Sequence, residues 1–130
     1  MDIIFLIGRV LFGGILLIMA INHFMKLGFM AGYATSKNVP MPRFAVFISG
    51  VFLAAGAIGI GAGILVEWAV FSLALFLIPV SLMMHNFWAI DNSQQRMMEM
   101  VNFMKNMAIL GGAIMTLAIG EWPFAIFPFL

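Results

Sequence analysis

The chain has 130 residues, of which 65% are hydrophobic and only 8% are charged, against about 25% charged residues in ordinary soluble domains. Its net charge of +1 offers no basic surface for nucleic acid, so no nucleic-acid partner is expected. The sequence contains no cysteine, which excludes disulfides, cysteine-ligated zinc and iron–sulfur clusters, and two histidines alone cannot complete a conventional zinc site. This composition is typical of a small integral membrane protein.

Four apolar segments follow one another, each close to the roughly 20 residues that a helix needs to cross a bilayer. They cover about residues 3–25, 44–66, 68–90 and 97–120. The second and third segments are separated by a residue or two around Glu67, so their helices should form an antiparallel hairpin. The sequence therefore predicts a single all-α domain over residues 1–130, a polytopic membrane protein with a four-transmembrane-helix bundle.

The distribution of lysine and arginine predicts how this bundle is oriented. The polar stretch between segments one and two, and the polar stretch that follows segment three and runs into the start of segment four, hold five basic residues, whereas the two termini and the turn at Glu67 hold none. Basic connections face the cytoplasm, so both termini should be extracytoplasmic, in the cytoplasmic (inner) membrane of a prokaryote. Trp68 and Trp122 should then mark the outer membrane interface and Trp88 the inner one.

Small residues and a proline indicate how the helices pack. Gly59 and Gly63 form a GxxxG pattern, which allows two helix backbones to approach closely in lipid. A phosphate-loop interpretation of this glycine run lacks the preceding strand that such a loop requires. Pro79, inside the third segment, predicts a kink.

Arg9 lies about two turns inside the first predicted helix. It is expected either to snorkel outward or pair with Glu67 or Glu121, which would fix helix packing, or to form a site for an anion or a lipid headgroup.

Polar residues gather at the end of the bundle that is predicted to face the cytoplasm. The candidates are His23, His85, Asn86, Lys105 and Asn106. Together they offer two imidazoles, two amides and an ammonium, which could hydrogen-bond a quinone carbonyl and supply a proton, since histidine titrates near neutral pH. The alternative is that these side chains satisfy one another and interfacial water, or dock a partner.

The residues around this cluster also resemble the DoxX family. The similar runs are residues 76–88 (FLIPVSLMMHNFW) and 101–112 (VNFMKNMAILGG), with further similarity at Arg9 and in the loop at 39–42 (VPMP). The resemblance implies a four-helix membrane protein of the group that includes the small subunit of an archaeal thiosulfate:quinone oxidoreductase. Other members are associated with membrane redox complexes of sulfur-transfer and superoxide-detoxifying proteins. Many members carry an acidic residue in the second helix, near the place where this chain has Ser49.

Three functions are compatible with these patterns. The first is a subunit of a membrane redox complex that contributes to a quinone site. The second is a purely structural accessory subunit of a larger respiratory or photosynthetic complex, and the third is a small-solute carrier. The expected partners are other membrane-protein subunits, lipid and quinone, without a covalent cofactor or a bound metal. No carboxylate pair or nucleophile–base pair is apparent in the sequence, so no autonomous enzyme is expected and no catalytic residue is assigned.

Overall fold

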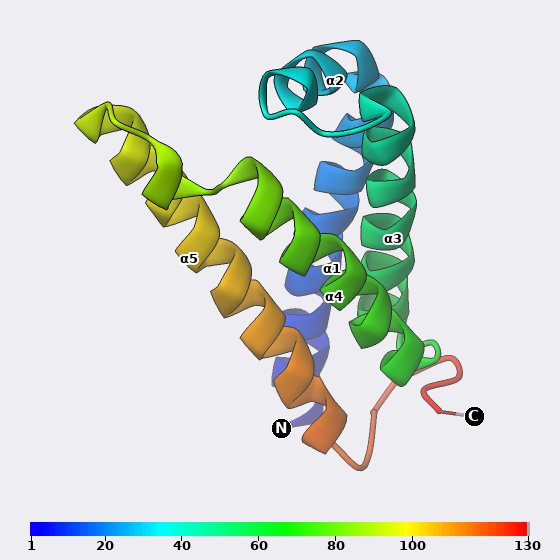
Figure 1. Cartoon of the computed structure of the whole chain (residues 1–130). Coiled ribbons are helices and arrows are strands. Elements are labelled where there is room, and N and C mark those ends of the chain that lie inside the picture. Colours follow the sequence, from blue (N-terminus) through cyan, green and yellow to red (C-terminus); the bar gives the residue numbers. More distant parts are fainter. Residues whose placement is uncertain (130) are drawn as a thin grey trace.

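The computed structural model describes residues 1–129, and four of its helices are long and apolar enough to cross a membrane (Figure 1). They are α1 (Asp2–Met25), α3 (Pro42–Ala62), α4 (Val66–Met84) and α5 (Ser93–Met115). The predicted all-α class and the four long apolar helices are therefore confirmed.

Three short helical elements complete the fold, namely α2 (Leu27–Ser36) and the 3₁₀ turns η1 (Phe87–Ala89) and η2 (Thr116–Ala118). The sequence pattern predicts only a connection in the region of α2, between the apolar segments 3–25 and 44–66. Its helix is stabilised because Ala31 and Ala34, three residues apart on one face, are buried together with Val46 of α3.

Local chemistry sets the helix ends a few residues away from the predicted ones. Gly63, at φ +67°, has the left-handed conformation that ends α3, so this helix stops before residue 66. Helix α5 begins earlier than residue 97 because the Asn92 side chain accepts a hydrogen bond from the Gln95 backbone N–H and caps the first turn.

The helices alternate in direction, as the short connections require. In Figure 1, α1 and α3 lie side by side, and α4 and α5 lean across them. The start of α1 and the C-terminal segment up to residue 129 lie at the same end of the bundle as the turn between α3 and α4, whereas α2 and the connection between α4 and α5 lie at the opposite end. We refer to this second end, which carries α2, as the α2 end.

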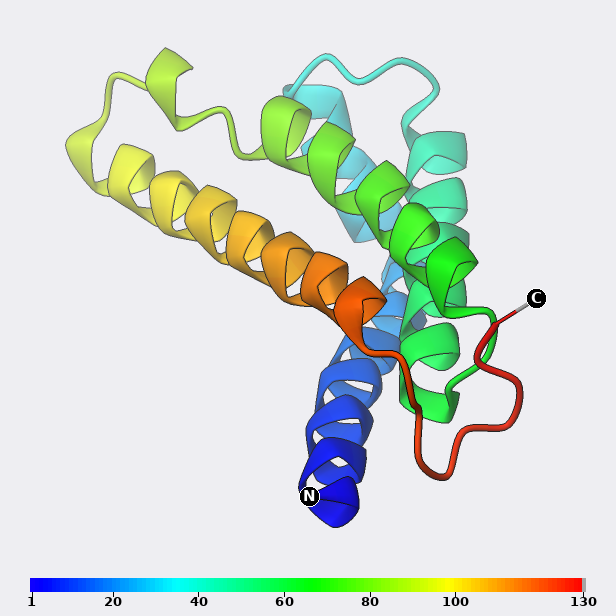
Figure 2. The ribbon, with the colours of Figure 1, turned by 90° about the horizontal axis from the view of Figure 1, so that it is seen from below.

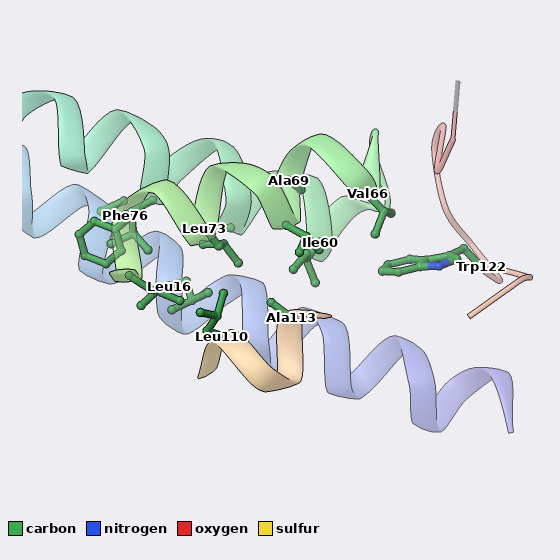
Figure 3. Close-up of a cluster of buried hydrophobic side chains, with 14 residues drawn as sticks. Leu16, Ile60, Val66, Ala69, Leu73, Phe76, Leu110, Ala113 and Trp122 are labelled. Carbon is green, nitrogen blue, oxygen red and sulfur yellow. The ribbon is translucent and has the colours of Figure 1, made fainter. Parts of the chain in front are cut away.

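The hydrophobic core joins all four long helices. Figure 3 shows Leu16 of α1, Ile60 of α3 and Leu73 of α4 converging on Leu110 and Ala113 of α5. The same cluster contains Trp122, which follows the last helix. Trp122 is only 7% exposed and its ring packs edge-on against Phe5. It therefore belongs to the core rather than to an exposed aromatic belt, because the C-terminal segment folds back onto the bundle.

This C-terminal segment is hydrogen-bonded to the turn between α3 and α4. The backbone N–H of Phe127 donates to the Gly63 carbonyl at 2.9 Å, and the N–H of Leu65 donates to the Phe127 carbonyl at 2.8 Å. Figure 2 shows the segment running from the end of α5 past this turn. The segment therefore satisfies backbone groups that the two helix ends leave free.

Glycines allow two of the helix–helix contacts. A Cβ atom on Gly13 of α1 would lie 2.6 Å from the Ala57 carbonyl oxygen and 2.7 Å from Gly61 Cα, both backbone atoms of α3. A Cβ atom on Gly59 of α3 would likewise lie too close to α4, because it would overlap the Ala69 Cβ atom. The predicted close packing between helices thus holds for Gly59. Gly63, just beyond the end of α3, is also closely packed, but against Ala125 of the C-terminal segment and the Arg9 side chain.

The side of the membrane on which the α2 end lies stays a prediction, and the absence of native cysteine makes it easy to test. A cysteine at Ser36 or Ser93, at the α2 end, should resist an impermeant thiol reagent in intact cells. A cysteine at Gly120, near the opposite end, should react. Labelling at Ser36 and protection at Gly120 would reverse the orientation.

Candidate functional site

A cavity of about 780 Å³ lies at the α2 end of the bundle and is the candidate site. Each long helix contributes the half nearest α2, including Met19 of α1, Phe52 of α3, Val80 of α4 and Met98 of α5. Most of the wall is apolar, and the volume falls within the range of roughly 300–1,000 Å³ that small-molecule sites occupy. The cavity can therefore hold a largely apolar headgroup.

A hydrogen-bonded group of three side chains, Tyr33–Glu99–His85, lies in this wall. Glu99 of α5 is 5% exposed, and each of its carboxylate oxygens has a partner. The Tyr33 hydroxyl lies 2.5 Å from Glu99 Oε1, and His85 Nδ1 lies 2.5 Å from Glu99 Oε2. An ionised carboxylate can only accept, so Tyr33 and His85 are the donors, and such charge-assisted bonds are the strong ones. Glu99 thereby joins α5 to α2 and to the end of α4.

Glu99 also perturbs Tyr33. Burial, together with the hydrogen bond to Glu99 and the negative charge of that carboxylate, raises the pKa of Tyr33 to about 12. The phenol consequently stays protonated at neutral pH and can donate to Glu99. Because the folded-state pKa is the higher one, this contribution to stability is complete below about pH 10 and is lost as the pH rises towards 12.

Tyr33 is the single tyrosine of the chain, so its ionisation can be followed directly by ultraviolet absorbance. At pH 11 an unperturbed tyrosine is about 90% ionised, whereas Tyr33 should remain mostly protonated. Glu99→Gln should shift the titration towards lower pH, though only in part because burial remains. A wild-type midpoint near pH 10 would contradict the bond to Glu99.

A second polar contact lies farther along the cavity wall, away from the α2 end. The Asn106 side-chain amide donates to Ser81 Oγ at 3.2 Å, and both residues are buried. Its neighbour Lys105 is exposed, and the Lys105 ammonium lies 3.3 Å from the Asn102 side-chain oxygen.

His23 is held by its own helix. Its Nδ1 lies 2.8 Å from the Met19 carbonyl oxygen, and its ring packs edge-on against Phe76. A carbonyl only accepts, so Nδ1 carries a hydrogen, and in the neutral imidazole Nε2 is left as a hydrogen-bond acceptor.

Four of the five residues predicted for the site line the cavity, namely His23, His85, Lys105 and Asn106. Asn86 does not, because its side-chain oxygen accepts a hydrogen bond from Lys37 at 3.0 Å. Within residues 1–129 no side chain of the five is hydrogen-bonded to another of them. They therefore share a cavity without forming the directly connected cluster that one interpretation of the sequence allowed.

Glu99 and Tyr33 are not among the residues predicted for the site, although the residue spacing in α5 contains a signal for Glu99. Glu99, Asn102 and Asn106 are three and four residues apart and so share one helix face. A carboxylate on the face that also carries the polar candidates indicates a position directed at the site.

Arg9 lies outside this cavity, near the opposite end of the bundle. It is 4% exposed, its Nη2 donates to the Phe124 carbonyl at 2.6 Å, and its guanidinium carbon lies 5.9 Å from the ring centroid of Phe5 and 5.7 Å from that of Trp122. Among residues 1–129 it forms no ion pair with Glu67 or Glu121, so the expected pairing is wrong. A backbone carbonyl takes that role because the C-terminal segment folds over the guanidinium.

The fold and the site together define a multi-pass membrane protein with four long apolar helices and a ligand-sized cavity that contains a buried carboxylate. The DoxX family matches residues 4–86, more than half of the chain, and the chain belongs to this family. No curated protein and no solved structure matches it.

The matched range contains Tyr33 and His85 but ends before α5. The resemblance noted at residues 101–112 therefore stays a prediction, as does any role for Glu99 in other members of the family.

Proposed function

We propose that the chain is a subunit of a membrane redox complex and that its cavity binds a quinone headgroup. The observation that carries this proposal is the buried Glu99, hydrogen-bonded to Tyr33 and His85 in the wall of a mainly apolar cavity. A quinone headgroup is apolar over most of its surface and has two carbonyl oxygens, so it needs an apolar enclosure with a few polar groups.

Proton exchange is the chemistry that these side chains suit. Reduction of a quinone to a quinol adds two electrons and two protons, one proton to each carbonyl oxygen. An imidazole can both take up and release a proton, and from His85 one hydrogen bond leads to Glu99 and a second leads on from Glu99 to Tyr33 of α2. The group of three side chains would thus exchange protons with the water on the α2 side, which we place in the prokaryotic cytoplasm.

The electrons would come from a redox centre in a partner subunit, because a chain without cysteine cannot ligate an iron–sulfur cluster by itself. The resemblance to the DoxX family, the group that includes the small subunit of an archaeal thiosulfate:quinone oxidoreductase, supports electron supply by a partner subunit. In this proposal the chain binds and protonates quinone, and its partner oxidises the electron donor.

A structural accessory role is the second candidate, and α5 is the element that favours it. Of the four spans α5 is the least buried, and it exposes Met97, Met98, Val101 and Met104. Flexible methionine side chains adapt well to a neighbouring helix. In that case a partner subunit would cover α5 and the cavity would hold only lipid.

Quinone extraction from the purified protein tests the proposal. Protein is purified from membranes in mild detergent and the co-purified quinone is quantified by chromatography. Ser49→Trp places a large ring in the cavity wall, whereas the matched control Ser93→Trp adds the same ring at an exposed position. The wild type and the control should retain quinone, and the cavity variant should lose at least 90% of it.

Equal retention by the two tryptophan variants would place any quinone outside the cavity. Quinone absent from the wild type, after reloading with a short-chain quinone has also failed, would favour the accessory role.

A further inference from the structure

The two full charges of the cavity wall both come from α5. Among residues 1–129, Glu99 supplies the one carboxylate that lines the cavity and Lys105 supplies the one ammonium. They are six residues apart, which is roughly 9 Å along a helix axis. Their side chains form no ion pair with each other.

The two charges differ in how their hydrogen-bonding groups are used. Both oxygens of Glu99 are engaged, by Tyr33 and by His85. The Lys105 ammonium has three donors but only one contact, at 3.3 Å, to the neutral side-chain amide of Asn102. Among the described residues no carboxylate lies within 4.0 Å of it. The cavity therefore contains a cation without a counter-ion.

The setting makes this cation costly. Lys105 is exposed on the surface of the chain itself, and it lies within α5, one of the four helices that are long and apolar enough to cross a membrane. Ionisable residues within membrane-spanning helices face cavities or partners and mark ligand pathways. The neighbouring residue Asn106 holds this part of α5 to α4 through Ser81.

We infer that Lys105 and Asn102 form an anion-binding subsite within the cavity and that it takes the ionised oxygen of a hydroxyquinone headgroup. This inference rests on the proposed function and adds the charge of the ligand to it. An ionised oxygen gains a partner at Lys105, while the negative charge of Glu99 repels it from the α2 end of the cavity. The two charges of α5 therefore orient the headgroup as well as bind it.

Two matched ligands isolate this effect. An alkylated hydroxynaphthoquinone is an anion at neutral pH, and the methylnaphthoquinone with the same tail is neutral. Their dissociation constants are measured for the full-length protein in uncharged detergent. The wild type should bind the anion at least tenfold more tightly than the neutral compound.

Variants then assign the preference to Lys105. Lys105→Gln and Lys105→Met should both remove the tenfold preference by weakening binding of the anion, and their melting temperatures in detergent report that the variants are folded. Lys105→Arg should keep it. Lys26→Gln, at an exposed lysine outside the cavity wall, should behave as the wild type.

The other outcomes separate failure of the proposed function from failure of the anion-binding subsite. If the wild type binds neither compound, the proposed function fails along with the inference. If it binds both equally, or if Lys105→Gln keeps the preference, the inference alone fails. If phosphatidylglycerol displaces the anion from the wild type but not the neutral compound, a lipid phosphate occupies the subsite and the assignment to quinone is wrong.

Discussion

Replacing Gly13 with alanine should lower the thermal stability of the protein, whereas replacing the adjacent Gly14 should raise it slightly. The new methyl group at position 13 would lie 2.6 Å from the Ala57 carbonyl oxygen and 2.7 Å from Gly61 Cα. Neither is a side-chain atom that can rotate away, so α1 and α3 must move apart. Overpacking of this kind costs about 1–3 kcal/mol, and more when the backbone has to shift.

Gly14 is the matched control, because a methyl group there meets nothing within 4 Å. Exchanging glycine for alanine within a helix is favourable by roughly 0.5–1 kcal/mol. The melting temperatures of the two variants in detergent should therefore move in opposite directions. Equal melting temperatures would show that α1 and α3 do not pack through Gly13.

In the redox complex that we propose, changing Glu99 to glutamine should lower quinone-dependent turnover by about 10²-fold, the smallest usual contribution of a positioned acid–base group. The amide can still accept from Tyr33, but it cannot exchange a proton with His85 as a carboxylate does. The side chain has nearly the same shape, so assembly of the complex should persist.

Glu67→Gln is the matched control, since this exposed carboxylate lies in the first turn of α4, at the opposite end of the bundle. It should leave turnover unchanged. Turnover of the Glu99 variant within twofold of the wild type would exclude Glu99 from proton exchange and would favour the accessory role.

The long helices can be predicted because the signal for each, a long run of apolar residues, lies within its own segment of the sequence. The apolar run at 3–25 nearly coincides with α1 (Asp2–Met25), since uninterrupted hydrophobicity is a property of the segment itself. The helix α2 was missed because the decisive interaction, the packing of Ala31 and Ala34 on Val46, depends on where α3 lies.

The candidate site was predictable only in part, for the same reason. His23 and His85 were placed near one end because antiparallel helices bring such ends together, and both line the cavity. The partner of Glu99 is Tyr33, 66 residues away, and the partner of Arg9 is the carbonyl of Phe124, 115 residues away. Every residue has a backbone carbonyl, so the sequence pattern cannot indicate which carbonyl accepts from Arg9. Only the fold identifies the carbonyl of Phe124.

Photo-crosslinking with a reactive quinone tests the central claim most directly. Purified protein is illuminated with an azidoquinone, and the labelled peptides are identified by mass spectrometry. The label should fall on the cavity walls, within residues 19–23 of α1, 45–52 of α3 and 95–106 of α5, and an excess of unlabelled quinone should prevent it. Labelling confined to exposed side chains such as Ile3, Ile7 and Leu11, and unaffected by competing quinone, would contradict a quinone site in this cavity.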